Sequence, residues 1–266
     1  MASSYKFHFT ESGNTAQPPV VFLHGFIGCG SDWSGIVTEL SNSFHSLMPD
    51  LPGHGRTIVE GSDESYLMEY TARGLIDWLD SISIDKCYLV AYSMGGRLGL
   101  YLAINYPDRF DKIVLESSSP GLKTAEERTA RRTHDNGIAN KLQTAPMIQF
   151  LREWYDQPLF TSLRQQPQQL AALLENRSAN DREGLAKSLQ MMGTGRQPSM
   201  WPRLGEVKSD TLLIVGEKDA KFRAIAKEMA GLMPDATISV VADTGHNVHF
   251  EKPDEFAALV KRFLMR

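Results

Sequence analysis

The sequence has no long apolar run, few cysteines and no excess of positive charge. Its 266 residues contain no run of 18 or more apolar residues, so we expect no membrane span. The amino terminus, Met1 to His8, lacks the apolar segment of a secretory signal. Two cysteines, Cys29 and Cys87, are too few for a disulfide framework, which favours a cytoplasmic protein. A net charge of −4 argues against nucleic acid or an anionic membrane as the main partner.

Short apolar strands alternate with amphipathic helices along most of the chain. Hydrophobic residues make up 42% of it, which is enough for a folded core. The predicted strands are residues 20–23, 44–48, 87–91, 111–115, 211–215 and 237–241. The predicted helices are residues 31–42, 65–81, 94–106, 222–233 and 254–265. The strands are mostly apolar rather than alternating, as is typical of parallel strands buried on both faces. The pattern predicts βαβ units and a mostly parallel α/β sheet, with the loops after the strands along one edge.

One stretch, residues 120–205, interrupts this alternation with helical patterns and no convincing strand. We interpret it as a helical cap inserted between two strands of a core formed by residues 1–119 and 206–266. The alternative is a second, independent domain. The stretch holds 12 Lys and Arg against 8 Asp and Glu, whereas the rest holds 16 against 24. The mild overall acidity is therefore an average over a basic cap and an acidic core.

Ser93 lies at a predicted turn between a strand and a helix, with small residues two positions before and after it. Ala91 and Gly95 occupy those positions. A sharp turn of this kind holds a nucleophilic serine in a strained conformation and requires small neighbours. The positive end of the following helix would face the serine oxygen. An ordinary strand, loop and helix with a chance serine is the alternative.

Two further segments, His24-Gly25 after one strand and Pro49-Asp-Leu-Pro-Gly-His-Gly55 after the next, add to this motif. Together the three segments resemble the α/β-hydrolase fold family. The resemblance implies an oxyanion hole formed by the backbone N–H groups of Phe26 and Met94, which would stabilise developing negative charge. We interpret His24 and His54 as structural histidines near the site.

In that family the acid and then the histidine follow the serine along the chain. Asp219 lies just beyond a strand end, and His246 follows Gly245 in the loop after the last strand. We therefore assign Asp219 as the orienting acid and His246 as the base, because a serine needs a base and the base needs a carboxylate. The alternatives are His249 for the base and Asp243, Glu217 or Glu116 for the acid.

Arg97 and Tyr92 indicate an acidic substrate. Arg97 lies four residues after Ser93, one helical turn along the same face. A guanidinium at that position is costly unless an anion meets it. The cap adds a basic helix with Arg128, Arg131 and Arg132, although interleaved Glu126 and Glu127 are also compatible with a solvated, salt-bridged face.

Several cap segments together resemble one family more specifically. They are Pro120-Gly-Leu122, Glu127-Arg128, Trp154-Tyr-x-Gln-Pro-x-Phe160 and Met192-Gly-Thr-Gly195. With the core motifs, the whole chain resembles the 2-succinyl-6-hydroxy-2,4-cyclohexadiene-1-carboxylate synthases of menaquinone and phylloquinone biosynthesis. The resemblance implies a lyase that eliminates pyruvate from a tricarboxylate, with a triad of Ser93, His246 and Asp219. It also implies substrate contacts by Tyr92, Arg97, Arg128, Trp154, Tyr155 and Arg177.

Lys123 departs from the family pattern, which has Gln after Pro-Gly-Leu. A lysine there is still able to meet a carboxylate. We expect no metal and no cofactor, because no Cys and His spacing fits a metal site and the chemistry needs neither. The expected partner is the small-molecule substrate alone, with the protein a monomer or weak homo-oligomer. The competing hypotheses are a carboxylesterase or C–C bond hydrolase of the same fold, and a ligand receptor that retains the pocket.

Overall fold

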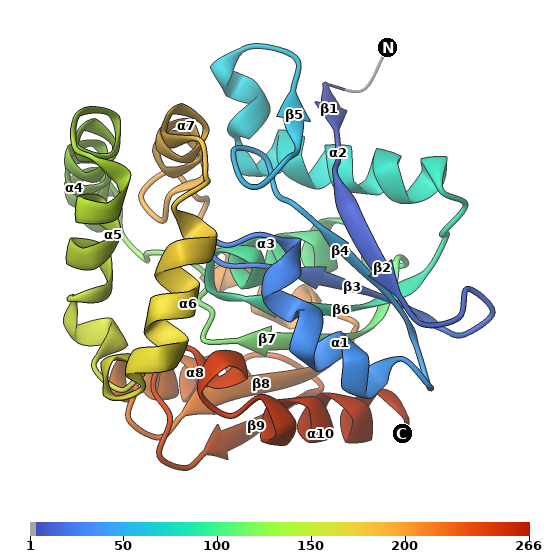
Figure 1. Ribbon diagram of the computed structural model, residues 1–266. Coiled ribbons are helices and arrows are strands. Elements are labelled where there is room, and N and C mark those ends of the chain that lie inside the picture. Colours follow the sequence, from blue (N-terminus) through green and yellow to red (C-terminus); the bar gives the residue numbers. More distant parts are fainter. Residues whose placement is uncertain (1–3) are drawn as a thin grey trace.

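A central sheet organises the molecule (Figure 1). The computed structural model describes residues 4–266, and in that range seven strands form one sheet in the order β2-β4-β3-β6-β7-β8-β9. All neighbouring strands are parallel except β2 and β4. The strands are β2 (Phe9–Ser12), β3 (Pro19–Leu23), β4 (His45–Pro49), β6 (Cys87–Tyr92), β7 (Phe110–Glu116), β8 (Asp210–Gly216) and β9 (Ala236–Val241).

The strands predicted from the sequence are confirmed, each within one residue at either end. The edge strand β2 was not predicted, nor was the small antiparallel pair of β1 (Tyr5–Lys6) and β5 (Ile58–Val59). β2 reads Phe-Thr-Glu-Ser and none of its residues is fully buried. Its partner β4 supplies the backbone hydrogen bonds, so an apolar pattern was not required for it to form.

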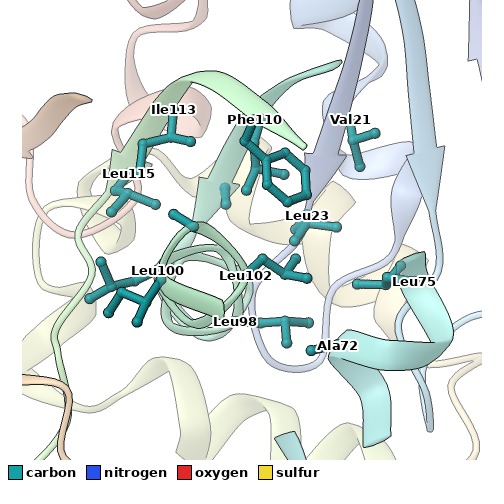
Figure 2. Close-up of a cluster of buried hydrophobic side chains, with 14 of the residues drawn as sticks. Val21, Leu23, Ala72, Leu75, Leu98, Leu100, Leu102, Phe110, Ile113 and Leu115 are labelled. Carbon is teal, nitrogen blue, oxygen red and sulfur yellow. The ribbon is translucent and has the colours of Figure 1, made fainter. Parts of the chain in front are cut away.

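Helices cover both faces of the sheet, as expected for strands that are apolar on both faces. They are α1 (Ser34–Leu40), α2 (Met68–Ser81), α3 (Ser93–Asn105), α8 (Ala220–Ala230) and α10 (Pro253–Leu264). Consecutive residues of β6 face opposite ways: Leu89 packs with α2, α3 and α8, and Val90 packs with α1 and α10. Figure 2 shows α3 nearly end on, with Leu98 and Leu102 between the strands and Ala72 of α2. The predicted helices are confirmed, although residues 31–42 begin with a 3₁₀ turn, η1 (Gly30–Trp33).

The chain between β7 and β8 is helical, and residues 120–205 contain no strand. Its main helices lie to one side of the sheet in Figure 1. They are α4 (Ala125–Thr144), α5 (Met147–Tyr155), α6 (Pro167–Arg177) and α7 (Arg182–Met192). Short 3₁₀ turns join them: η3 (Pro158–Phe160), η4 (Leu163–Gln165) and η5 (Trp201–Glu206). These helices share a hydrophobic cluster that also contains Ile27 from the loop after β3, so the stretch packs directly on the sheet's loops.

The parallel strands end at one edge of the sheet, and the loops that follow them meet there. Ser93 follows β6, Asp219 follows β8 and His246 follows β9. Three segments that are far apart in the sequence are thereby brought together. Among the helices of residues 4–266, none combines the length and apolarity needed to cross a bilayer.

Candidate active site

Ser93 is held in a strained turn by close backbone packing. Its φ is +48°, in the left-handed region that non-glycine residues rarely adopt. The first turn of α3, which contains Gly95, lies very close to β3. A Cβ at Gly95 would be 2.4 Å from the carbonyl oxygen of Leu23. The N–H of Gly95 also donates to the carbonyl of His24 at 3.1 Å. The requirement for a small residue two positions after the serine therefore has a direct steric cause.

The structure brings Ser93, His246 and Asp219 into one hydrogen-bonded chain. Ser93 Oγ lies 3.1 Å from His246 Nε2, and His246 Nδ1 lies 2.7 Å from Asp219 Oδ2. Asp219 also accepts from the N–H of Phe222 at the start of α8, which fixes its carboxylate. A proton on Nδ1 that faces a carboxylate leaves Nε2 free to accept the serine proton. This arrangement can generate a strong base at the serine oxygen.

The alternative acids and base lie elsewhere. His249 Nδ1 is 2.7 Å from Glu116 Oε2, and both residues are buried. The alternative base, His249, and the alternative acid, Glu116, therefore pair with each other. The His249 ring also stacks on Trp33. Glu217 is exposed and accepts from the N–H of Asp243, itself exposed. None of these four residues lines the cavity that contains Ser93.

Phe26 and Met94 both line this cavity. Within residues 4–266 neither of their backbone N–H groups donates to a protein acceptor. Met94 lies in the first turn of α3, where the backbone N–H groups have no helical partner and the helix dipole favours negative charge. The pair is free to donate to an oxygen bound near Ser93 Oγ.

His24 and His54 have the structural contacts expected of them. His24 donates from Nδ1 to the carbonyl of Gly25 at 2.8 Å and accepts at Nε2 from the N–H of Leu51 at 2.9 Å. His54 donates from Nδ1 to the carbonyl of Pro52 at 3.2 Å. Burial lowers the pKa of His24 and lowers that of His54 well below its ordinary value. Both rings are therefore neutral supports of the loops around Phe26.

A cavity of about 540 Å³ opens over Ser93, lined by the core edge on one side and the cap on the other. Of the residues predicted to form the site, it contains Ser93, Asp219, His246, Phe26, Met94, Arg97 and Trp154. Trp154 of α5 packs its ring against Phe26 at 5.3 Å between centroids. Apolar surface from α4, α5 and α7 completes the wall, so a bound molecule would be largely shielded from water.

Arg97 is a buried positive charge in this cavity, with an exposed fraction of 9%. Its Nη1 donates to the carbonyl of Met192 at 2.9 Å and to Gln197 Oε1 at 2.8 Å. No carboxylate within residues 4–266 forms an ion pair with it. Burial lowers the pKa of Arg97 to about 10, and Arg131 acts in the same direction, so the group stays charged at neutral pH. Asp135 acts in the opposite direction without forming an ion pair with Arg97, so the site contains a positive charge that a bound anion would neutralise.

Arg131 was named from the sequence in the basic helix of the cap but was not assigned a substrate contact, and it lines the cavity from α4 together with His134 and Ile138. Its Nε lies 2.7 Å from Oδ1 of buried Asp135, which leaves the two terminal nitrogens of its guanidinium for a ligand. The spacing of 131, 134 and 138 is that of one helical face. The helical period groups these three residues on one face, but it does not say which face of α4 meets the cavity.

Arg128, which was predicted to contact substrate, does not line the cavity. Its Nη1 lies 3.3 and 3.4 Å from the carbonyl oxygens of Leu122 and Lys123. Lys123 also faces away, because its ammonium pairs with Glu228 and lies over the Trp201 ring at 4.4 Å. These two side chains stabilise the start of α4.

Tyr92, Tyr155 and Arg177 border a side pocket of about 50 Å³ that shares Ser93 and His246 with the main cavity. Tyr92 donates to Asn247 Oδ1, and Arg177 donates to the Tyr155 hydroxyl. Arg177 also forms an ion pair with buried Asp32 at 2.8 Å, so its charge is already compensated. These three residues can therefore contact a substrate only where part of it enters this side pocket. Among residues 4–266, no three His, Cys, Asp or Glu side chains are grouped as a metal ion would require.

Comparison with known proteins agrees with this architecture. The α/β hydrolase fold family model matches residues 18–253, and the chain therefore belongs to that family. The solved structure of MenH from S. aureus has a TM-score of 0.89 and 35% identity, covering 99% of this chain and 98% of that one. The 2-succinyl-6-hydroxy-2,4-cyclohexadiene-1-carboxylate synthase of Photorhabdus laumondii is 35% identical over 95% of this chain and 87% of its own length. Within the α/β-hydrolase fold, the chain belongs to the family of these synthases.

A further relative is the chloroplastic protein PHYLLO of Arabidopsis thaliana. It is 33% identical over 96% of this chain, which covers only 16% of that longer protein. The relatives confirm the predicted fold and family, including the resemblance across the cap. Their similarity extends over both the core and residues 120–205.

Proposed function

We propose that Ser93, His246 and Asp219 carry out the synthase reaction of this family. The reaction eliminates pyruvate from 2-succinyl-5-enolpyruvyl-6-hydroxy-3-cyclohexene-1-carboxylate to give 2-succinyl-6-hydroxy-2,4-cyclohexadiene-1-carboxylate. The predicted activity, that of a carbon–oxygen lyase, agrees with the synthase relatives. The observation that carries the assignment of residues is the hydrogen-bonded chain from Asp219 through His246 to Ser93 at the floor of a cavity with an unpaired arginine.

The first step is removal of a proton, not acyl transfer. His246 accepts the proton of Ser93 Oγ as that oxygen takes the ring proton next to the succinyl ketone. The electron pair left on carbon moves onto the ketone oxygen, which becomes an enolate. The N–H groups of Phe26 and Met94 donate to that oxygen, as they would to the oxyanion of an ester.

The second step expels the leaving group. As the enolate re-forms the ketone, the electron pair moves through the ring alkene and breaks the bond between the ring carbon and the enolpyruvyl oxygen. The new double bonds give the 2,4-diene, the bonding pair leaves on the oxygen as the enolate of pyruvate, and protonation of the enolate carbon gives pyruvate. Protonated His246 lies at the nucleophile and is the nearest acid of the triad to return this proton.

Arginines bind the carboxylates of the substrate in this proposal. Arg97 and Arg131 line the main cavity and hold unused guanidinium nitrogens. Arg177, with its unpartnered Nε, borders the side pocket, where it would meet a group that reaches past Ser93. Charged hydrogen bonds of this kind fix orientation as well as affinity. We propose that residues 120–205 are a cap that closes over the tricarboxylate and that residues 1–119 and 206–266 form the catalytic core.

The setting of the reaction is also a proposal. The thiols of Cys29 and Cys87 are free, which fits a reducing cytoplasm. We also propose that the protein is a monomer or weak homo-oligomer.

Pyruvate release from the purified protein tests this function, followed by a coupled lactate dehydrogenase assay. We expect Ser93→Ala and His246→Ala each to lower kcat by a factor on the order of 10³. Ser34→Ala, at an exposed serine of α1, is the matched control and should keep full activity. Wild-type turnover by Ser93→Ala would exclude the role of the serine.

A carboxylesterase or C–C bond hydrolase uses the same parts, since the Ser93–His246 contact and the free N–H pair also suit acyl transfer. Hydrolysis of p-nitrophenyl esters without pyruvate release would favour that alternative. Binding of a ligand with neither reaction, followed by capture of a partner protein, would instead favour a receptor.

A further inference from the structure

Glu251 is a buried carboxylate between the loop of His246 and the cap. It ends α9 (Val248–Glu251) and has an exposed fraction of 7%. Its Oε1 accepts from Ser162 Oγ at 3.0 Å and from the backbone N–H of Gly245 at 3.2 Å. Its Oε2 accepts from the same N–H at 3.0 Å. The carboxylate therefore joins two segments that are more than 80 residues apart in the sequence.

The donors to Glu251 are neutral. Within residues 4–266 no basic side chain forms an ion pair with it. Burial raises the pKa of Glu251, while the hydrogen bonds from Gly245 and Ser162 oppose that rise. A buried carboxylate without a cation costs stability unless its hydrogen bonds are well made. The buried Glu251 carboxylate lies at the junction between the cap and the loop that contains His246.

On the core side, Glu251 holds the residue that precedes the base. A Cβ at Gly245 would lie 2.1 Å from Ser162 Oγ. A Cβ at Gly216, at the end of β8, would lie 2.1 Å from the carbonyl oxygen of Gly245. The backbone before His246 is thus enclosed between the sheet edge and the cap, so a displacement of either neighbour moves the base.

On the cap side, the segment of residues 158–163 contacts both the substrate cavity and the base. Pro158 and Leu159 line the main cavity. The ring of Phe160 lies 6.2 Å from that of His246, centroid to centroid. Ser162, in the same segment, donates to Glu251. A ligand that presses on this segment is therefore linked through one carboxylate to the loop of His246.

We propose that Glu251 is a positioning residue that couples cap residues 158–163 to His246 and aligns the base with Ser93 when the cap is closed. Glu251 lines neither the main cavity nor the side pocket, so it acts through Gly245 and does not touch substrate. This inference rests on the proposed function only in using Ser93 and His246 as the reacting pair.

The test measures two quantities on the full chain. One is kcat and KM for pyruvate release, and the other is the rate at which diisopropyl fluorophosphate modifies Ser93. The second depends on the Ser93–His246 pair and not on the identity of the substrate, so it decides the inference even if the proposed function fails. The variants are Glu251→Ala, Glu251→Gln and Ser162→Ala. Glu255→Gln, at an exposed glutamate beside Lys252, is the matched control.

We expect Glu251→Ala to lower both kcat and the modification rate about tenfold or more, with KM changed less than about twofold. Glu251→Gln retains one acceptor oxygen and should recover part of both rates. The control should match the wild type in both. Wild-type modification rates in both Glu251 variants would overturn the proposal, and if the alanine variant does not fold, the glutamine variant decides alone.

Coupling to the cap is tested by combining the substitutions. Ser162→Ala should lower kcat about threefold in the wild-type background and have no further effect in Glu251→Gln, because both act through the same carboxylate. Independent, additive effects of the two substitutions would show that Ser162 does not act through Glu251, and would overturn the link to the cap.

Discussion

At the scale of single residues, Arg97 is expected to favour catalysis but not the stability of the folded protein. Its guanidinium is buried with neutral acceptors and no carboxylate, which disfavours the folded protein without ligand. We predict that Arg97→Met lowers kcat/KM for pyruvate release about 100-fold, on the order of 3 kcal/mol. The free energy of unfolding should stay the same or increase, measured by urea denaturation.

Arg196→Met is the matched control, because Arg196 is an exposed arginine of the same chain. It should leave both quantities unchanged. A loss of stability in Arg97→Met that accounts for the loss of activity would contradict the assignment of Arg97 to substrate binding.

Two arginines one turn apart on α4 give a second prediction. Arg131 lines the cavity and is oriented by Asp135, whereas Arg128 donates to backbone carbonyls outside it. We predict that Arg131→Met raises KM about tenfold or more, and that Arg128→Met changes it less than about threefold. Steady-state kinetics on both variants measures the difference. Equal effects, or a larger effect at Arg128, would restore the prediction made from sequence.

These residues also show which contacts can be predicted from the sequence. Ser93, Asp219 and His246 each follow a strand, and parallel strands bring such loops together whatever the details of packing. The cap residues have no such constraint. Whether Arg128 or Arg131 faces the cavity depends on the rotation of α4, which is fixed by packing against α7 and not by local pattern.

At the scale of elements, the turn from β6 into α3 tolerates no added atom on its inner side. A Cβ at Gly95 would meet the backbone oxygens of Leu23 and His24 at 2.4 and 2.6 Å. Backbone atoms cannot move aside as a side-chain end can, so we predict that Gly95→Ala lowers the free energy of unfolding by about 2–3 kcal/mol. It should also reduce turnover, because α3 carries Ser93 and Met94.

The comparison is Gly137→Ala in the exposed middle of α4, where a Cβ would meet nothing within 4 Å. Alanine favours a helix over glycine, so this variant should gain about 0.5–1 kcal/mol. Urea denaturation of both variants measures whether each substitution lowers or raises the free energy of unfolding. A neutral result at Gly95 would mean that β3 and α3 can separate, which would weaken the steric account of the turn.

The elements themselves were predictable to different degrees. Strands buried on both faces, such as β6 and β8, carry continuous apolar runs that identify them. β1 and β5 have two residues each and exist through pairing with each other, which no local pattern encodes. The cap was predicted as helical, but its junction with the core through Glu251 depends on contacts between distant segments.

At the scale of the whole molecule, the charges are divided between two parts. Residues 120–205 hold an excess of basic side chains, and the core has the opposite balance. The cavity lies where the two meet, and Arg97 and Arg131 face it from opposite sides. A tricarboxylate in the cavity would neutralise the charge of these two arginines, one from each part of the chain.

Two buried histidines, His24 and His54, make the stability of the whole fold depend on pH. Burial lowers the pKa of His24 and of His54 from 6.5, so the folded protein keeps both rings neutral. The unfolded chain therefore binds these protons at a higher pH than the folded protein does, so their contribution to stability is present above 6.5 and is lost as the pH falls below it. The raised pKa of Glu251 acts with the opposite sign at lower pH.

We predict that the free energy of unfolding decreases from about pH 7 to about pH 5, and that His54→Gln makes this slope shallower by about 1 kcal/mol per pH unit on average over that range. Glutamine does not titrate, so the slope reports the proton on His54 even if the substitution also changes packing and shifts all values equally. Urea denaturation at a series of pH values measures the slope, with His134→Gln, at an exposed histidine of α4, as the control for the substitution. An unchanged slope in His54→Gln would mean that His54 is protonated inside the folded protein, which is costly because Nε2 has no hydrogen-bond partner among residues 4–266.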